Sequence, residues 1–235
     1  MVQTLDVLRS GQPMDCSAVV LSSTWLTPTI KSVWLELDRP EFLFLPGQAL
    51  WPKFERDGKR FSKIYSIASS PAYCPRVELC VSRVGWSSAA LQDLLPGDSI
   101  LSRGAYGLLT LDRLPTQPRL YLAEGSGIAP IKSHLDWLFE QELSQPVWLI
   151  QSNPETPAQL PYRSHWRSLQ QRWQSFHYLE AIDRSPEALL SQFPTLAGLE
   201  IDICAVNQRV DELYEAVLGR GASSEKVRLE KFMAF

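Results

Sequence analysis

The chain has 235 residues, of which 45% are hydrophobic and 21% charged, and it carries a formal net charge of -3. This balance predicts a globular protein with a sizeable core and excludes a disordered chain. Because the net charge is small and negative, nucleic acid and anionic membranes are poor candidate partners.

The four cysteines, Cys16, Cys74, Cys80 and Cys204, are scattered and show no metal-ligand spacing with the three histidines. We therefore expect free thiols in a reducing cytoplasm and no protein-bound metal or iron-sulfur cluster. The N-terminal segment lacks a basic start followed by an apolar stretch, and no apolar run reaches 18 residues. This predicts a soluble, untargeted chain without a membrane span.

The first half of the chain consists of short runs rich in β-branched and aromatic residues, punctuated by Pro-Gly turns. The runs are residues 17–27, 30–37, 48–55, 63–69, 76–84 and 98–104. Such a series predicts a six-stranded antiparallel Greek-key β-barrel.

The fourth run ends in the sequence KIYSIASSP, residues 63–71. Period-two alternation places Tyr65 and Ile67 on one face of a strand and Ser66 and Ala68 on the other. Taken alone, this segment is typical of an ordinary half-buried strand that leaves through a Ser/Pro turn.

The sixth run is preceded by a short apparent helix over residues 88–95. Gly85 frees the backbone there, and Ser87 or Ser88 is placed to cap the helix. The exposed amides of such a helix face any nearby anion, so the segment is either a plain helix cap or a phosphate site.

After Pro115 the pattern changes to apolar strands that alternate with helix-length segments. The strands are residues 119–125, 146–152, 176–182 and 201–206, and the helices are residues 128–143, 161–173, 186–193 and 210–221. This alternation predicts an α/β domain with a parallel sheet. We place the boundary in the Pro-rich linker, which gives a barrel of residues 1–114 and an α/β domain of residues 115–235.

The first strand of the second half turns into a helix through Gly125, Ser126 and Gly127. Two glycines let the backbone approach a ligand, and the helix amides favour a diphosphate. A structural turn is an equal alternative, and Glu124 counts against an anion unless its side chain points away. With one plausible phosphate site in each half, the chain suggests two nucleotides that meet across a domain cleft.

The order of motifs resembles the ferredoxin-NADP reductase superfamily over nearly the whole chain. The motifs are PGQ at 46–48, KIYSIASSP at 63–71, the Gly-x-x-Ser segment at 85–88, PGD at 96–98, RGAYG at 103–107 and EGSGIAP at 124–130. The resemblance implies a flavin-binding barrel followed by a nicotinamide dinucleotide-binding domain.

The family's Arg-x-Tyr-Ser motif corresponds to Lys63, Tyr65 and Ser66. The resemblance implies that Lys63 contacts the flavin phosphates, that Tyr65 stacks on the isoalloxazine and that Ser66 lies near its N5 atom. Lysine in place of arginine keeps the charge but loses the bidentate fork. By the same resemblance Gly85 and Ser88 hold the flavin phosphates, and Ser87, the other candidate helix cap, is a further candidate for binding the cofactor.

For the nicotinamide nucleotide, the resemblance implies a site lined by Gly125, Ser126 and Gly127. Cys204 corresponds to a family cysteine beside the nicotinamide, although a core thiol is an equal reading. Ala205 and Gln151 replace frequent glycines and are expected to hinder entry. Ser152 is a candidate contact for a ribose or a phosphate, and Tyr162-Arg163 for the adenine end.

The tail RLEKFMAF resembles the family's Glu-x-Phe ending. This implies that Glu230 lies near the reacting rings and that Phe235 covers the flavin or the core. Glu230 is otherwise a solvated charge on the last strand.

The resemblance implies an enzyme that moves hydride between NADH or NADPH and FAD, with FMN less favoured, and passes electrons to an unknown small or protein acceptor. Residues 1–114 hold 12 Lys plus Arg against 11 Asp plus Glu, and this near-neutral balance favours a small acceptor over an acidic ferredoxin. Two alternatives are a flavin reductase that uses free flavin as its substrate and a flavin-binding subunit without nicotinamide binding.

Overall fold

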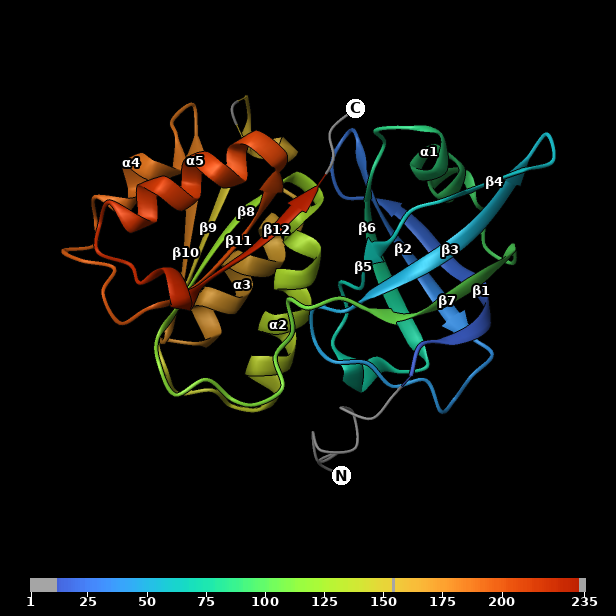
Figure 1. Ribbon diagram of the computed structural model, residues 1–235, viewed down its shortest axis with the longest axis horizontal. Coiled ribbons are helices and arrows are strands. Elements are labelled where there is room, and N and C mark those ends of the chain that lie inside the picture. Colours follow the sequence, from blue (N-terminus) through green and yellow to red (C-terminus); the bar gives the residue numbers. More distant parts are fainter. Residues whose placement is uncertain (1–11, 154, 233–235) are drawn as a thin grey trace.

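The computed structural model describes residues 12–153 and 155–232 as two parts, a curled antiparallel sheet and a parallel sheet covered by helices (Figure 1). The predicted barrel and α/β domain are therefore confirmed. Residues 107–118 connect the two sheets, and the predicted division after residue 114 falls inside this connection.

In the part of the chain that the structure describes, seven strands form the barrel sheet. They are β1 (Met14–Trp25), β2 (Ile30–Leu37), β3 (Ala49–Arg56), β4 (Lys59–Ser62), β5 (Tyr65–Ser66), β6 (Arg76–Ser82) and β7 (Ser99–Tyr106). Their order is β4-β3-β7-β1-β2-β6, with β5 paired to β3. A single bridge between Ile67 and Leu79 links the segment after β5 to β6 and closes the sheet on itself.

Strand β4 is absent from the six predicted runs, because its sequence KRFS is short and largely polar. It pairs with β3 through a hairpin whose turn residues, Asp57 and Gly58, have φ angles of 52° and 70°. Asp-Gly is a strong hairpin signal, since both central positions of such a turn need positive φ.

The predicted strand over residues 63–69 is much shorter in the structure. Only Tyr65 and Ser66 pair as a strand, and the next amides reach two different partners, Ile67 to Gln48 and Ala68 to Glu78. Ser70 then caps a short 3₁₀ helix, η2 (Pro71–Tyr73), which ends the extended stretch. The predicted alternation is nevertheless observed, because Tyr65 and Ile67 join the barrel core while Ala68 packs with the α/β domain and Ser66 bonds to it.

Helix α1 (Trp86–Asp93) begins two residues earlier than predicted. Gly85 is its N-cap, and the Ser88 hydroxyl accepts hydrogen bonds from the amides of Val84 and Gly85. The helix is fixed to the barrel by Gln92, whose side chain donates to carbonyls on two neighbouring segments. Gln92 thereby holds the last turn of the helix against the barrel, while the bonds of Ser88 fix the first turn to the segment that follows β6.

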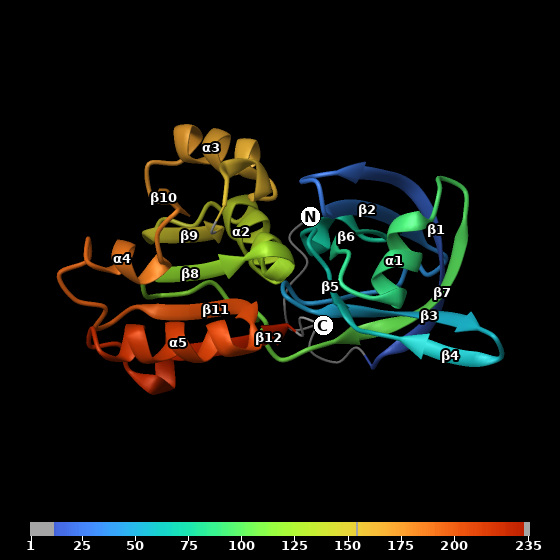
Figure 2. The ribbon, with the colours of Figure 1, turned by 90° about the horizontal axis from the view of Figure 1, so that it is seen from above.

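The second part contains, among the described residues, a parallel five-stranded sheet in the order β10-β9-β8-β11-β12. Its strands are β8 (Arg119–Glu124), β9 (Val147–Asn153), β10 (Phe176–Ile182), β11 (Glu200–Val206) and β12 (Val227–Phe232). Figure 2 shows α2 (Ile128–Glu140) and α3 (Arg163–Arg172) on one face and α4 (Pro186–Leu190) and α5 (Asn207–Leu218) on the other. None of the helices in residues 12–153 and 155–232 is long and apolar enough to cross a membrane.

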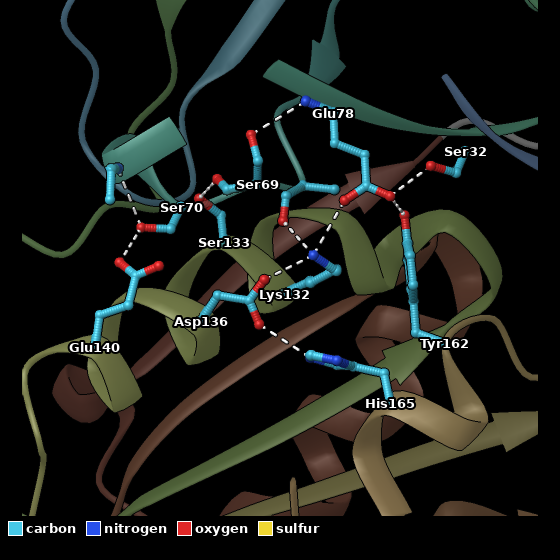
Figure 3. A network of polar contacts seen from close by, with 12 residues as sticks. Ser32, Ser69, Ser70, Glu78, Lys132, Ser133, Asp136, Glu140, Tyr162 and His165 are labelled. Carbon is cyan, nitrogen blue, oxygen red and sulfur yellow. Dashed lines mark hydrogen bonds and ion pairs between the residues drawn. The ribbon is translucent and has the colours of Figure 1, made fainter. Parts of the chain in front are cut away.

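The two parts meet at helix α2, whose polar side chains form a buried network with the barrel (Figure 3). Lys132 pairs with Glu78 of β6 at 3.0 Å and with Asp136 at 2.6 Å. Glu78 also accepts hydrogen bonds from Ser32 at 2.5 Å and from Tyr162 at 2.7 Å. Because buried charges are tolerated only when they are paired and hydrogen-bonded, this network favours a single arrangement of the two parts.

Candidate functional site

A cavity of about 790 Å³ lies between the barrel and the α/β domain. The barrel contributes residues 61–66, Cys80, Ser82 and residues 84–88, and the α/β domain contributes residues 124–127, Ala129, Val206 and residues 230–232. The cavity therefore brings together the two segments that the sequence analysis singled out as phosphate sites, with the Tyr65-Ser66 pair between them.

Tyr65 and Ser66 both line this cavity. The Tyr65 hydroxyl donates to the Ser87 hydroxyl at 3.2 Å, and burial raises the pKa of the phenol above its ordinary value. The Ser66 hydroxyl donates to Glu230 Oε1 at 2.9 Å, a contact between residues 164 positions apart. Burial raises the pKa of Glu230, and the hydrogen bond from Ser66 only partly opposes this shift. The structure thus joins Ser66 and Glu230 across the two domains.

The first turn of α1 forms one wall of the cavity. The backbone amides of residues 86–88 come before the first helical hydrogen bond, from the Ala89 amide to the Gly85 carbonyl, and carry the positive end of the helix dipole. The Ser88 hydroxyl is already engaged with the backbone of Val84 and Gly85. An anion held here would therefore meet backbone amides and the Ser87 hydroxyl rather than the Ser88 side chain.

The opposite wall is the turn η3 (Gly125–Gly127) at the carboxyl end of β8. Gly125 has a φ angle of +54°, and among the described residues a Cβ built there would meet no heavy atom within 4 Å. A Cβ on Gly127 would stand 2.3 Å from the carbonyl oxygen of Cys204. Glycine at position 127 is therefore required for the turn to pack against β11, and the turn presents bare backbone to the cavity.

Glu124, which argued against an anion at this turn, is drawn toward neighbouring groups. It accepts a hydrogen bond from Ser152 at 2.7 Å and pairs with Arg209 at 3.1 Å. Arg209 is also shared with Glu187 and Glu212, so it neutralises Glu124 only in part. Ser152 lies outside the cavity lining, and its hydroxyl donates its hydrogen bond to Glu124.

Cys204 of β11 and Gln151 of β9, which were expected beside the nicotinamide nucleotide, lie inside the α/β domain. The Cys204 side chain is fully buried, it is not part of the cavity lining, and burial raises the pKa of its thiol well above the ordinary range. Gln151 is also buried and is held by the Pro161 carbonyl and the Tyr178 hydroxyl. Phe235 lies outside the described residues.

Sequence reasoning missed two aromatic residues of the lining, Phe61 and Trp86. Both had a detectable signal. Phe61 is the period-two neighbour of Lys63 and Tyr65, and Trp86 is the first variable position of the Gly-x-x-Ser segment.

No family model matches the sequence. The chain is 33% identical over 143 residues to ferredoxin-NADP reductase B of Sorangium cellulosum, covering 60% of this chain and 58% of that protein. It is 31% identical over 173 residues to the phenol hydroxylase P5 protein of Acinetobacter pittii, covering 72% and 48%. The chain thus spans about half the length of these two relatives.

Among solved structures, the fold is similar to that of a ferredoxin NADP⁺ reductase from Neisseria gonorrhoeae with bound FAD and NADP. The TM-score is 0.78 at 21% identity, over 94% of this chain and 99% of the other. The motif order, the two curated relatives and the barrel joined to a parallel sheet agree, and the chain belongs to the ferredoxin-NADP reductase superfamily.

Proposed function

We propose that the protein is a flavoprotein oxidoreductase that moves hydride between NADH or NADPH and FAD. The observation that carries this proposal is the shared cavity, which places Tyr65 and Ser66 of the barrel opposite the Gly125–Gly127 turn of the α/β domain. The similar Sorangium protein is named a ferredoxin-NADP reductase, and the Neisseria structure holds FAD and NADP.

The barrel side of the cavity fits a flavin dinucleotide. Tyr65 offers a half-buried aromatic ring, while Lys63 and the first amides of α1 offer positive potential for a diphosphate. When bound, the flavin supplies the hydride-accepting chemistry. The protein's part is to orient the ring and to exclude water from it.

The α/β side of the cavity fits the nicotinamide nucleotide. The Gly125–Gly127 turn lies at the carboxyl edge of the parallel sheet, where ligands of open α/β sheets bind. Arg209 reduces the negative charge that Glu124 brings to this edge. Cys204 and Ser152 are weaker candidates for contact with this nucleotide, because neither residue belongs to the cavity lining.

Glu230 and Ser66 are placed to accept and transfer a proton beside the reacting rings. Burial favours the protonated carboxyl of Glu230, and Ser66 donates its hydroxyl to Glu230 Oε1. When the Ser66 oxygen takes up a proton from the cavity side, its own hydroxyl proton can pass to Glu230 Oε1, and the carboxyl that forms is the state that burial favours.

For the electron acceptor we propose a redox protein of the ferredoxin kind rather than a small molecule. This revises the expectation from the near-neutral barrel, and its support is the name of the Sorangium relative. We also propose a reducing, cytoplasmic setting, because all four cysteines are free thiols.

The experiment is an anaerobic titration of the purified 235-residue chain with NADH and, separately, NADPH. We expect a yellow protein whose flavin absorbance bleaches with at least one of the two nucleotides. A protein that binds no flavin, or whose bound flavin neither nucleotide reduces, contradicts the proposed function.

A further inference from the structure

A turn residue of the α/β domain, Tyr162, has an unusual backbone conformation. It is the N-cap of α3 and has a φ angle of 59°, in the left-handed region. A bulky aromatic residue rarely adopts this region, because its Cβ crowds the following carbonyl oxygen. Asp57 and Asp183, two of the other described non-glycine residues with positive φ, are of a type that tolerates it. The conformation of Tyr162 therefore needs support from outside the local chain.

The Tyr162 side chain is engaged at its hydroxyl and at its ring. The hydroxyl donates to Glu78 Oε1 of β6 at 2.7 Å, and Lys132 Nζ lies over the ring, 5.1 Å from its centre. Figure 3 shows this side chain reaching from the α/β domain to the Glu78 carboxylate. Hydrogen bonds to a carboxylate are among the strong ones, and Glu78 is buried. The barrel thus supplies the support that the strained turn needs.

The residues on either side of Tyr162 are held by the parallel sheet. The Pro161 carbonyl accepts a hydrogen bond from Gln151 Nε2 of β9 at 3.0 Å. Arg163 donates two hydrogen bonds to Glu180 of β10, at 2.9 and 3.0 Å. The start of α3 is therefore anchored at three neighbouring residues to three strands, and through Tyr162 one of these strands belongs to the barrel.

This segment lies along the ligand-binding edge of the parallel sheet. The strand order reverses between β8 and β11, and ligands of open α/β sheets bind outside the carboxyl ends of the strands at such a reversal. Strand β9 is the neighbour of β8, and residues 155–162 connect its carboxyl end to α3. A dinucleotide whose nicotinamide enters the cavity therefore extends over either this segment or the start of α5.

Charge favours the side of Tyr162. At the start of α3, the guanidiniums of Arg163 and Arg167 share the carboxylate of Glu180. At the start of α5, carboxylates outnumber the cations with which they pair. These ion pairs join Arg209 and Lys231 to Glu124, Glu187, Glu212 and Asp211. A diphosphate is therefore attracted more strongly to the start of α3 than to the start of α5.

We infer that Tyr162 is a positioning residue for the nicotinamide nucleotide. Through its hydrogen bond to Glu78, the barrel holds residues 155–163 in the conformation that binds the half of the nucleotide outside the cavity. The inference rests on the proposed function and adds a residue that acts through this segment, because the ring and the hydroxyl of Tyr162 are already engaged. The affinity for the nucleotide then depends on a contact between the two domains.

The first test uses Tyr162→Phe, which removes the hydroxyl alone. The dissociation constant of NADH or NADPH, from the concentration dependence of flavin reduction in stopped flow, should rise roughly five- to thirtyfold. This is the factor by which a left-handed backbone is disfavoured once its support is lost. Amide hydrogen exchange in residues 155–163 should become faster by at least the same factor. The limiting rate of flavin reduction should not change, because the cavity lining is untouched.

Ser32→Ala is the matched control, because the Ser32 hydroxyl donates to the same Glu78 oxygen from within the barrel. It should leave the exchange of residues 155–163 and the dissociation constant at their wild-type values. Equal effects in Ser32→Ala and Tyr162→Phe would assign the effect to the interface as a whole and overturn the positioning role. Wild-type exchange and wild-type affinity in Tyr162→Phe would overturn it as well.

A second pair of variants separates positioning from direct contact with the nucleotide. Tyr162→Ala and Tyr162→Asn both lack the ring and the hydroxyl, but asparagine adopts the left-handed region several-fold more often than most residues. Tyr162→Asn should therefore bind the nucleotide more tightly than Tyr162→Ala, and equal dissociation constants contradict the inference. If Tyr162→Ala does not fold, Tyr162→Phe and Ser32→Ala decide the question. A wild-type chain whose flavin neither nucleotide reduces is a different result, because it rejects the proposed function and the nucleotide role of Tyr162 with it.

Discussion

The two ends of the cavity differ in the charge that they present to a ligand. The barrel end offers Lys63, the first amides of α1 and aromatic rings. The α/β end offers Glu124, whose partner Arg209 is shared with Glu187 and Glu212. An anion at the barrel end meets positive potential, whereas one at the α/β end meets Glu124 and two cations, Arg209 and Lys231, that are already paired with carboxylates.

This difference suits a ligand that stays and a ligand that leaves. Under the proposed function, the flavin is retained by the barrel and the nicotinamide nucleotide exchanges at the parallel sheet. The buried network around Lys132 and Glu78 holds the two ends in register. Variants of each region therefore test this difference between the two ends.

Glu78→Ala removes the carboxylate that pairs with Lys132 between the barrel and helix α2. Glu78→Ala leaves the Ser32 and Tyr162 hydroxyls without their acceptor and Lys132 with less compensation, which should lower the free energy of unfolding by about 3 to 5 kcal/mol. Urea unfolding measures it. Glu36→Ala on the neighbouring strand is the control, since its exposed pair with Arg76 should contribute less than about 1 kcal/mol. Equal losses of unfolding free energy in both variants would contradict a stabilising role for the buried network at the interface.

Gly127→Ala tests the α/β end alone. The new methyl would clash with the Cys204 carbonyl and move the turn, and a shift of about 1 Å in a reacting partner can slow a step about a hundredfold. We expect slow flavin reduction in stopped-flow experiments with flavin still bound. Gly219→Ala, at the end of α5 where contacts are ordinary, should reduce at the wild-type rate. Loss of flavin from Gly127→Ala would contradict the proposal that the barrel end alone retains the flavin.

Tyr65→Ala tests the barrel end. Losing the ring should weaken flavin binding by about 1 to 3 kcal/mol, in the range for burial of an aromatic contact. Equilibrium dialysis with FAD gives the affinity. Tyr73→Ala is the control, since Tyr73 is exposed and packs on the edge of Trp34 outside the lining. A wild-type affinity in Tyr65→Ala would exclude this ring from the flavin site.

The smallest effect concerns the pH dependence of stability at the junction of the two ends. The pKa of Glu230 is raised in the folded protein above its ordinary value of 4.5, so the folded state binds this proton more tightly than the unfolded state. The stability that Glu230 contributes is present below pH 4.5 and is lost as the pH rises through the folded pKa. Relative to Glu230→Gln, the wild type should therefore lose stability over that window in urea titrations. Ser66→Ala should extend the loss to higher pH, because the Ser66 hydrogen bond lowers this pKa; a parallel pH profile for wild type and Glu230→Gln contradicts the assignment.

Local patterns were sufficient for most of the architecture. Alternation identified the faces of residues 65–68, and the change from short β runs to strand-helix alternation located both sheets. The shortened strand at residues 65–66 and the missed strand β4 show the limit of this reasoning. Strand length depends on which neighbours accept the amides. The amide of Ile67 donates to Gln48, just before β3, and that of Ala68 donates to Glu78 of β6.

The order of motifs and the local turns follow from the sequence alone, because glycine and proline positions and residue periodicity restrict the backbone within a few residues. Contacts between distant segments are needed to bring Ser66 to Glu230, to pair Glu124 with Arg209 and Ser152, and to place Cys204 and Gln151 outside the cavity lining. Those placements follow from the pairing of β11 with β12 and from the packing of α2 on β6. Such long-range contacts are selected by the fit of whole surfaces, and no local pattern in the chain encodes that fit.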